Sequence, residues 1–320
     1  MIEKRLWHPV CEAACVRQAP VPVRLLEQDL VVWRDASGVL RAFADRCPHR
    51  GARFSLGRVH EGRLECPYHG WQFEGTGQCV RVPAVPGFVP PAGHRACSYE
   101  TQELAGLVWV RLEQGEEALP TIETEDVPRL RTLLVGPYDV ATSAPRIVEN
   151  FLDMSHFGFV HEGWLGDRGH TEIAPYRVET GEAGLLATGC RAWQPQSNRL
   201  ATGGTEVEYS YAVPAPYTAV LTKLPQAQDG YRDVIVLLVC PMEPERSRVW
   251  FRLAVTDFES SDEELSAFQH TIFTQDQPVL ESQTPKRLPL SGGELHSAAD
   301  RLSAAYRRWL GELGVVFGVC

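Results

Sequence analysis

Two pairs of residues with metal-binding side chains lie in short stretches that also contain proline and glycine. Cys47 and His49 are separated by one residue and Cys66 and His69 by two, with sixteen residues between the pairs. A glycine follows each pair closely, as at the tip of a tight loop. Two such loops, each offering one thiolate and one imidazole, can hold a single centre from two sides. These ligand types suit either a zinc ion or an iron–sulfur cluster with mixed ligation.

The ligand spacing separates these two kinds of centre. Zinc ligands usually come as Cys-x₂₋₄-Cys or His-x₃₋₅-His pairs, whereas each pair here mixes a cysteine with a histidine. The stretches Cys-Pro-His-Arg-Gly and Cys-Pro-Tyr-His-Gly-Trp closely resemble the loops of Rieske proteins, in which two cysteines and two histidines hold a [2Fe–2S] cluster. The resemblance implies that Cys47, His49, Cys66 and His69 are the cluster ligands. The loops lack the two extra cysteines of respiratory Rieske proteins and so resemble the oxygenase and ferredoxin type, whose low-potential cluster receives electrons ultimately from NADH.

A second group of polar residues lies in the middle of the chain. Asn150, Asp153 and His156 are spaced three apart, which places them along one stripe of a helix predicted over 146–157. Apolar residues surround this stripe, so we interpret it as a metal site; a solvated outer helix face is the alternative. His161 follows His156 by five residues, or about 140° around a regular helix. We therefore predict that the helix breaks at the glycine between the two histidines.

A third ligand is indicated by a carboxylate in an unusual place. The capping box that begins at Ser261 predicts a helix running to residue 282. Asp276 lies on the apolar stripe of this helix, whose other members are Leu265, Phe268, Ile272, Val279 and Leu280. A buried carboxylate is costly unless it binds a metal or pairs with a cation, and a buried arginine is the alternative partner. With His156 and His161 it would complete a 2-His-1-carboxylate triad, which leaves positions on non-haem Fe(II) open for O₂.

The two sites together resemble a Rieske non-haem iron oxygenase α-subunit. In this family a Rieske pair is followed by Asn-x₂-Asp-x₂-His-x₄-His and then by an aspartate on a late helix, as here. The resemblance implies that His156, His161 and Asp276 bind the mononuclear Fe(II). It also implies that Asp153 connects this iron to the cluster histidine of a neighbouring subunit, and that Asn150 lies beside the iron.

The length and layout resemble the homotrimeric branch of this family, which includes the vanillate and dicamba O-demethylases. Segments 161–168, 305–310 and 318–320 resemble the Rieske hydroxylases of saxitoxin biosynthesis. The resemblance implies an enzyme that uses O₂ and electrons from an NADH-dependent reductase or a ferredoxin. Its reaction is hydroxylation or oxidative demethylation of a small organic, aromatic or heterocyclic substrate. The alternatives are a desaturase or sulfoxidase of the same family, a pure electron-transfer Rieske protein, and a binding module with a degenerate iron site.

Strand and helix patterns predict the elements that position these residues. Short β-like runs at 21–26, 30–33, 39–43, 63–66 and 107–112 predict a small all-β domain over residues 1–118, with a linker at 113–128. Further runs at 177–180, 184–189, 205–213, 217–224, 234–240 and 248–258 predict an antiparallel sheet in the region 119–320, with a last helix at 297–311. The predicted class is α+β, an all-β Rieske domain followed by a catalytic sheet domain packed by helices.

Composition excludes several classes of protein. The 320 residues carry a net charge of −10, which argues against nucleic-acid binding. No apolar stretch approaches a membrane span, and nine cysteines in a chain without a secretion signal predict a cytoplasmic protein without disulfides. Against this acidic background, residues 41–65 hold six arginines and three acids, a local charge of +3. This patch suits an acidic ferredoxin-type donor; the alternative is that the arginines pair with acids of the protein itself or of a neighbouring subunit.

Overall fold

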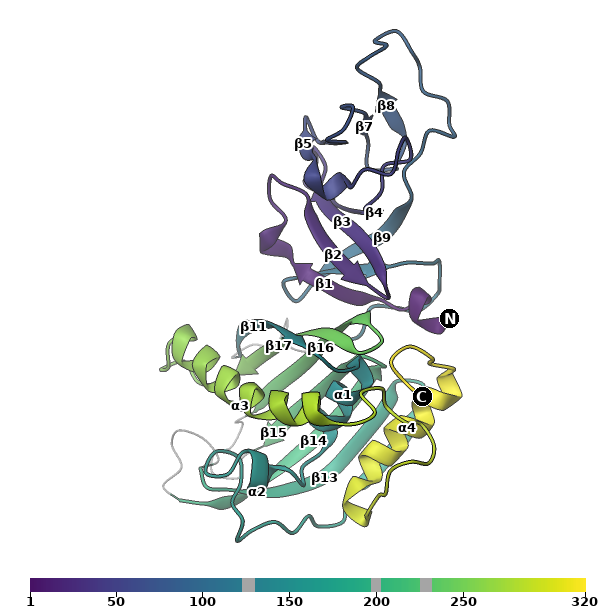
Figure 1. Cartoon of the computed structure of the whole chain (residues 1–320). Coiled ribbons are helices and arrows are strands. Elements are labelled where there is room, and N and C mark those ends of the chain that lie inside the picture. Colours follow the sequence, from purple (N-terminus) through teal and green to yellow (C-terminus); the bar gives the residue numbers. More distant parts are fainter. Residues whose placement is uncertain (123–129, 197–202, 225–231) are drawn as a thin grey trace. The chain divides into compact units, whose positions relative to one another are not determined.

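The computed structural model describes residues 1–122, 130–196, 203–224 and 232–320. The chain forms two compact units, Ile2–Leu119 and Pro120–Cys320 (Figure 1). Of the linker predicted at 113–128, residues 113–122 contain no helix or strand, and the remainder lies outside the described residues. None of the nine cysteines, all of which lie in the described ranges, forms a disulfide. No helix in these ranges is both long enough and apolar enough to cross a membrane.

The first unit consists of two antiparallel sheets. The larger has the order β1-β10-β9-β4-β3-β2 and the smaller the order β5-β6-β7-β8. Their bounds are β1 His8–Glu12, β2 Val21–Leu25, β3 Gln28–Arg34, β4 Leu40–Ala44, β5 Arg58–His60, β6 Arg63–Glu65, β7 Gln72–Phe73, β8 Cys79–Arg81, β9 Ser98–Leu104 and β10 Leu107–Arg111. Trp33, Phe43, Phe54 and Phe73 form a chain of edge-to-face aromatic contacts in the core. The same core contains two buried cysteines of the cluster loops, so the loops are anchored in it.

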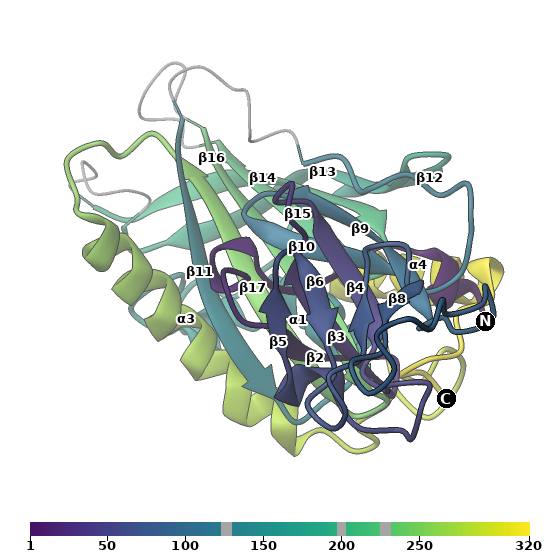
Figure 2. The same cartoon turned by 90° about the horizontal axis from the view of Figure 1, so that it is seen from above.

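The second unit is one antiparallel sheet with helices against it (Figures 1 and 2). Its strand order is β11-β17-β16-β15-β14-β13-β12. The strands are β11 Arg131–Val140, β12 Arg177–Gly181, β13 Gly184–Gln194, β14 Thr205–Ala215, β15 Thr218–Leu224, β16 Asp233–Glu243 and β17 Arg246–Val255. Burial alternates residue by residue along β14, as expected of a strand with one covered face.

Helices cover one face of this sheet. They are α1 Ala144–Leu152, α2 Phe157–Val160, α3 Asp262–Ser282 and α4 Arg301–Leu313. The central helix α1 packs on β15 and β16, α3 packs on β11, and α4 packs on β12 and β13. The predicted capping box at the start of α3 is present, with Ser261 and Glu264 exchanging side chain–backbone hydrogen bonds. The predicted α+β class, an all-β domain followed by an antiparallel sheet with helices, is confirmed.

A buried network of charges joins α1 to α4. Arg146 on α1 is 2% exposed and Arg307 on α4 is 6% exposed. Glu294, from the loop before α4, accepts hydrogen bonds from both guanidinium groups, at 2.5 and 2.6 Å. Glu149 on α1 accepts a bidentate pair of hydrogen bonds from Arg307, at 2.5 and 2.8 Å. Hydrogen bonds from Arg146, together with those from Arg307, outweigh partial burial and lower the pKa of Glu294 to about 2.

This network predicts a loss of stability in acid. The pKa of Glu294 is lower in the folded chain than in the unfolded chain, so its contribution is present above about pH 4.5 and is lost as the pH falls towards 2. We expect Glu294→Gln to lower the free energy of unfolding by ~2 kcal/mol at pH 7, after allowance for solvent screening, and by somewhat less than half as much at pH 3. Urea unfolding at both pH values measures this difference. Glu179→Gln, an exposed carboxylate on β12, is the control. An equal loss at both pH values would contradict the prediction.

Candidate metal centres and active site

The two cysteine–histidine loops are built alike. In each loop a glycine N–H donates to the carbonyl of the cysteine four residues earlier, Gly51 to Cys47 at 2.8 Å and Gly70 to Cys66 at 3.1 Å. The φ angles of these glycines are +74° and +68°, in the left-handed region that costs glycine little. The prolines and glycines noted in the sequence therefore shape two matching turns.

The two thiols lie together in the core of the first unit. Cys47 is 1% exposed and Cys66 is 3% exposed. The interaction between the two thiols raises the pKa of Cys47 and lowers the pKa of Cys66. The backbone N–H groups two and three residues after each cysteine also donate to its sulfur. Hydrogen bonds of this kind stabilise thiolate ligands and tune an iron–sulfur cluster.

The rings of the two histidines of these loops lie close to each other. The ring centroids of His49 and His69 are 4.7 Å apart. His49 stacks on Trp71 at 4.2 Å with the planes 7° apart, and Trp71 stacks in turn on His94 at 5.6 Å. The stack fixes the ring of His49, whereas His69 is exposed at the loop tip. One thiol and one imidazole from each of two matching turns provide the ligand set of a Rieske [2Fe–2S] cluster.

In the second unit a break in the helix brings two further histidines together. Helix α1 ends at Leu152, and Asp153 has an extended backbone (ψ 132°). The one-turn helix α2 then begins directly after His156 and ends directly before His161. Their Nε2 atoms are 3.2 Å apart. The predicted continuous helix over 146–157 is therefore wrong, and the chain bends before His156 rather than at the glycine.

That glycine has a different role. Gly158 lies inside α2, and a Cβ atom there would be 2.8 Å from the carbonyl oxygen of Asp167. Gly166 approaches equally closely, since a Cβ atom on it would be 2.8 Å from the backbone nitrogen of Gly158. The two glycines let the loop after His161 fold back onto α2, which supports the backbone that carries both histidines.

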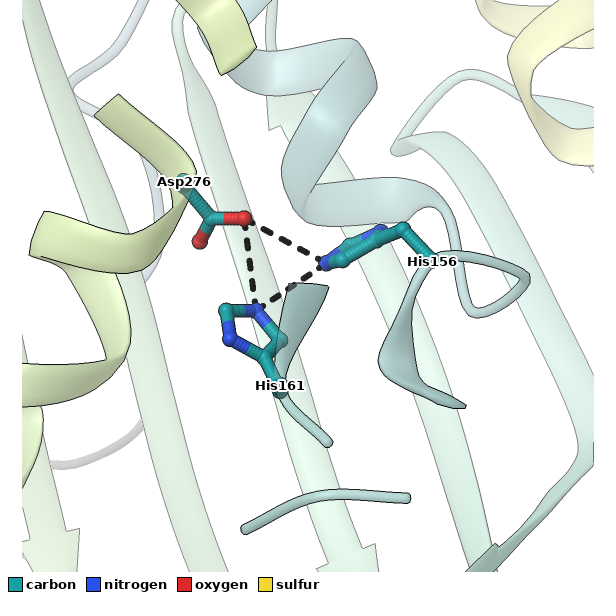
Figure 3. Close-up of side chains that lie close together, drawn as sticks. All are labelled: His156, His161 and Asp276. Atoms are coloured by element: carbon teal, nitrogen blue, oxygen red, sulfur yellow. Dashed lines mark hydrogen bonds and ion pairs between the residues drawn. The ribbon is translucent and has the colours of Figure 1, made fainter. Parts of the chain in front are cut away.

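Asp276 completes a triangle of metal-binding atoms with the two histidines (Figure 3). Its Oδ1 is 3.5 Å from His156 Nε2 and 3.3 Å from His161 Nε2. Asp276 is 7% exposed and His161 is 1% exposed. The Asp276 carboxylate faces the two histidines and Asn150. Within the described residues these side chains, and not a buried arginine, are therefore its partners.

Each member of the triangle is held by one further side chain. Nδ1 of His156 lies 3.2 Å from Asp153 Oδ2, and Nδ1 of His161 lies 2.8 Å from Gln275 Oε1. Asn150 donates its amide to Asp276 Oδ1 at 3.3 Å. Burial opposes ionisation of Asp153, but hydrogen bonds from His156 and from the backbone N–H two residues after Asp153 outweigh it and lower its pKa.

The triangle fits a metal ion. Because both Nδ1 atoms face acceptors, they carry the ring protons, and both Nε2 lone pairs face the Asp276 carboxylate. Three converging lone-pair donors repel one another unless a cation lies between them. With bonds of ~2.1 Å, edges of 3.2–3.5 Å would correspond to angles of roughly 100–113° at a shared ion. All three ligands then lie on one side of the metal, which is the arrangement of a 2-His-1-carboxylate facial triad.

A cavity adjoins the triangle. The triad and Asn150 lie in its wall with the amide of Gln269, and the rest of the lining is apolar. The apolar lining residues are Ile147, Phe151, Phe157, Leu165, Leu221, Ile235, Leu237, Phe251, Ile272 and Phe273. They come from α1, α2, the loop after α2, α3 and strands β15–β17. A mostly apolar cavity with a few polar groups is typical of a small-molecule site.

Two residues of this site are not among those predicted from the sequence. Gln269 and Gln275 both lie on α3. Gln269 is buried one helical turn before Ile272, on the same stripe as Asp276, so the reasoning that found Asp276 could also have found Gln269. Gln275 carries no such signal, because it lies off the apolar stripe. By contrast, Phe268 and Val279 of the predicted stripe are 45% and 43% exposed.

Half of the arginines in the segment 41–65 pair with acids of the same chain. Arg41 pairs with Asp35 at 2.7 Å, and Arg58 pairs with Glu65 at 2.7 Å. Arg53 reaches Asp29 at 3.3 Å. Three of the six arginines therefore follow the alternative in which they pair with the protein's own acids, and this reduces the charge available to steer an acidic donor.

Comparison with known families matches both parts of the chain. Residues 6–99 match the Rieske [2Fe–2S] domain, and residues 140–315 match the vanillate O-demethylase oxygenase C-terminal domain. The methylxanthine N1-demethylase NdmA of Pseudomonas putida is 32% identical over 97% of this chain and 89% of that protein. The methylxanthine N3-demethylase NdmB of the same organism is 32% identical over 98% of this chain and 90% of its own length.

Solved structures show the same relationship. NdmA with caffeine superposes with a TM-score of 0.86 at 31% identity, covering 97% of this chain and 90% of that one. Dicamba monooxygenase bound to dicamba shares the fold, with a TM-score of 0.77 at 20% identity, over 98% and 99% of the two chains. The predicted family, enzyme class and cofactors are thereby confirmed. The chain belongs to the Rieske non-haem iron oxygenases: it is an oxygen-incorporating oxidoreductase with a Rieske [2Fe–2S] cluster and a mononuclear iron, and it uses O₂, an organic substrate and an external electron donor.

Proposed function

We propose that this enzyme oxidatively demethylates a small, flat, uncharged heterocycle. His156, His161 and Asp276 hold the mononuclear iron in this proposal; Cys47, His49, Cys66 and His69 hold the cluster. One observation carries it: the converging triad opens onto an apolar cavity whose other polar side chains, among the described residues, are two neutral amides.

The cavity lining indicates the substrate class. Phe151, Phe157, Phe251 and Phe273 offer aromatic faces for packing against a planar ring. The amide of Gln269 can pair with a ring carbonyl or ring nitrogen. Among the described lining residues there is no lysine or arginine that would neutralise a substrate carboxylate. These features favour a neutral N-methylated heterocycle over an anionic methoxybenzoate, in agreement with the methylxanthine substrates in the names of the relatives.

The chemistry follows from the bound groups and the residues that hold them. When bound, the two metal centres supply two electrons and activate O₂, so that with two protons one oxygen atom enters a methyl C–H bond and the other leaves as water. The resulting N-hydroxymethyl group then releases formaldehyde and leaves an N–H. Asp153 and Gln275 hold the ligand rings, and Asn150 holds the Asp276 carboxylate. The surrounding phenylalanines exclude water from the reacting methyl group.

A substrate panel tests this proposal. The purified oxygenase, with a donor reductase and NADH, is offered caffeine, theobromine, vanillate and dicamba, and formaldehyde and the demethylated products are quantified. We expect stoichiometric formaldehyde from at least one methylxanthine and none from the two anions. Turnover of only the anionic substrates, or product that gains oxygen without losing a methyl group, would overturn the proposal.

Gln269 is the residue in the cavity with the clearest expected effect on substrate binding. Replacing it by leucine removes the amide while keeping a similar volume, so we expect KM to rise roughly tenfold, the value of about one hydrogen bond. Iron content and the visible spectrum of the cluster should stay unchanged, because Gln269 contacts neither metal site in our assignment. Steady-state kinetics measure the effect. An unchanged KM for every accepted substrate would show that the amide does not bind it.

The donor and the assembly follow the homotrimeric branch in this proposal. The chain works as a homotrimer, takes electrons from an NADH-dependent reductase directly or through a ferredoxin, and resides in the cytoplasm. The family resemblance supports a route in which the cluster of one chain serves the iron of another. Co-expression of Cys66→Ser and Asp276→Ala chains tests this route, because mixed trimers should recover activity that neither variant has alone. Mixed trimers without activity would argue against it.

A further inference from the structure

The imidazole of His161 is fixed at both of its nitrogens. Nε2 faces the other two members of the triad, and Nδ1 lies 2.8 Å from the side-chain oxygen of Gln275. His161 is almost fully buried, at 1% exposure, so water does not compete strongly for this contact. Because the oxygen of Gln275 accepts a hydrogen bond from Nδ1–H, the ring proton stays on Nδ1 and the Nε2 lone pair is free to bind metal.

The two histidines of the triad are held by groups of different charge. His156 has the carboxylate of Asp153 behind it, at 3.2 Å, whereas His161 has a neutral amide. Histidine ligands are most often backed by a carboxylate, a backbone carbonyl or water. The site already contains two carboxyl groups, Asp276 in the triangle and Asp153 behind His156. A third carboxylate at residue 275 would also accept a hydrogen bond from Nδ1 of His161, but it would add a negative charge that the amide of Gln275 does not.

The sequence of α3 explains why one helix can serve two ligands. Gln275 and Asp276 are neighbours, about 100° apart around the helix axis. Asp276 faces the triad, and the longer side chain of Gln275 reaches the outer nitrogen of His161. Any movement of α3 therefore shifts the carboxylate ligand and the ring of His161 together.

From these contacts we infer that Gln275 is a positioning residue for the mononuclear iron: its amide oxygen sets the tautomer and orientation of His161 without adding charge to the site. The inference rests on the proposed function through the assignment of His161 as an iron ligand. It concerns the affinity of the site for the metal and is independent of which substrate the cavity accepts.

Metal affinity provides the test. The mononuclear iron is removed from the holoenzyme by mild chelation, and the visible spectrum is checked to confirm that the cluster remains. Fe(II) is then titrated back without oxygen against a competing chelator, with the EPR signal of the nitric oxide adduct as the readout. We expect Gln275→Leu to bind Fe(II) 10–100-fold more weakly than wild type. Gln275→Glu keeps an oxygen that accepts from Nδ1, so its affinity for Fe(II) should be no lower than about one third of the wild-type affinity.

Two further variants separate this inference from its premises. Gln277→Leu makes the same change two residues later on α3, where the amide donates to the Asp139 carbonyl of β11, and should leave Fe(II) affinity unchanged. His161→Ala should abolish binding. If His161→Ala still bound Fe(II), the ligand assignment and the proposed function would fail. If only Gln275→Leu bound normally, or if Gln275→Glu lost affinity as Gln275→Leu did, the inference about Gln275 would fail while the ligand assignment stood.

Discussion

Asp276→Ala should lose the mononuclear iron and all oxygenase activity while keeping the visible spectrum of the Rieske cluster. The reason is geometric, because Asp276 Oδ1 is the one carboxylate oxygen of the described site that lies within 3.5 Å of both Nε2 atoms. Iron analysis should fall from about three to about two irons per chain, since the cluster holds two. The cluster ligands belong to the other unit, so their spectrum should not change.

A matched control separates ligand loss from general damage to α3. Glu263→Ala removes an exposed carboxylate from the first turn of the same helix. It should retain about three irons per chain and full turnover. Full turnover by Asp276→Ala, or three irons per chain in that variant, would contradict the assignment of Asp276 as an iron ligand. Two irons in the control as well would mean that α3 tolerates no change, and the measurement would then be repeated with Asp276→Asn.

The sequence carried most of the information about the cluster loops. The turns there are local, since each glycine bonds back to its own cysteine four residues earlier. Turns of this kind depend on glycines and prolines that lie within a few residues of one another, so they can be predicted from the sequence. The aromatic stack of His49, Trp71 and His94 was not visible, because it depends on a segment more than twenty residues farther along the chain.

The bend between α1 and α2 could not be located from helical periodicity. The spacing of Asn150, Asp153 and His156 suits a helix, but the Asp153 carboxylate accepts the N–H of Ser155 at 2.7 Å. This local turn competes with the helix and directs the chain into an extended conformation at Asp153. An aspartate two residues before a serine was the available signal, and Gly158 was the more conspicuous but wrong choice.

Strand β11 was missed for a different reason. Only Val135 and Val140 of the strand are buried, and its pairing with β17 is interrupted between Val135 and Tyr138. An edge strand with a bulge shows neither the alternation nor the apolar run by which strands are recognised in a sequence. Its place in the sheet is set by contacts with β17 and α3, which only the folded chain provides.

Asp153→Asn should keep both metal centres but slow the delivery of electrons to the mononuclear iron by 10–100-fold, the range found when a group that supports a metal ligand is changed. The carboxylate holds His156 through Nδ1, and it remains ionised because hydrogen bonds outweigh its burial. An asparagine is nearly the same size but lacks the charge that raises the basicity of the ring. Single-turnover mixing of reduced enzyme and substrate with O₂, followed by the visible absorption of the cluster, measures the rate.

A second aspartate–histidine pair in the same region makes the control unusually close. Asp167 and His170 are also three residues apart and 3.0 Å from each other, but His170 is exposed, Asp167 is half-buried, and the pair belongs to no metal site in our assignment. Asp167→Asn therefore makes the same chemical change to the same kind of pair and should leave the rate of cluster oxidation unaltered. If Asp153→Asn oxidised its cluster at the wild-type rate, the carboxylate would be only a support for the α1–α2 bend. If instead the rate fell with the iron content unchanged, the effect would lie in the charge behind His156, because ligand geometry sufficient to retain the iron would have survived.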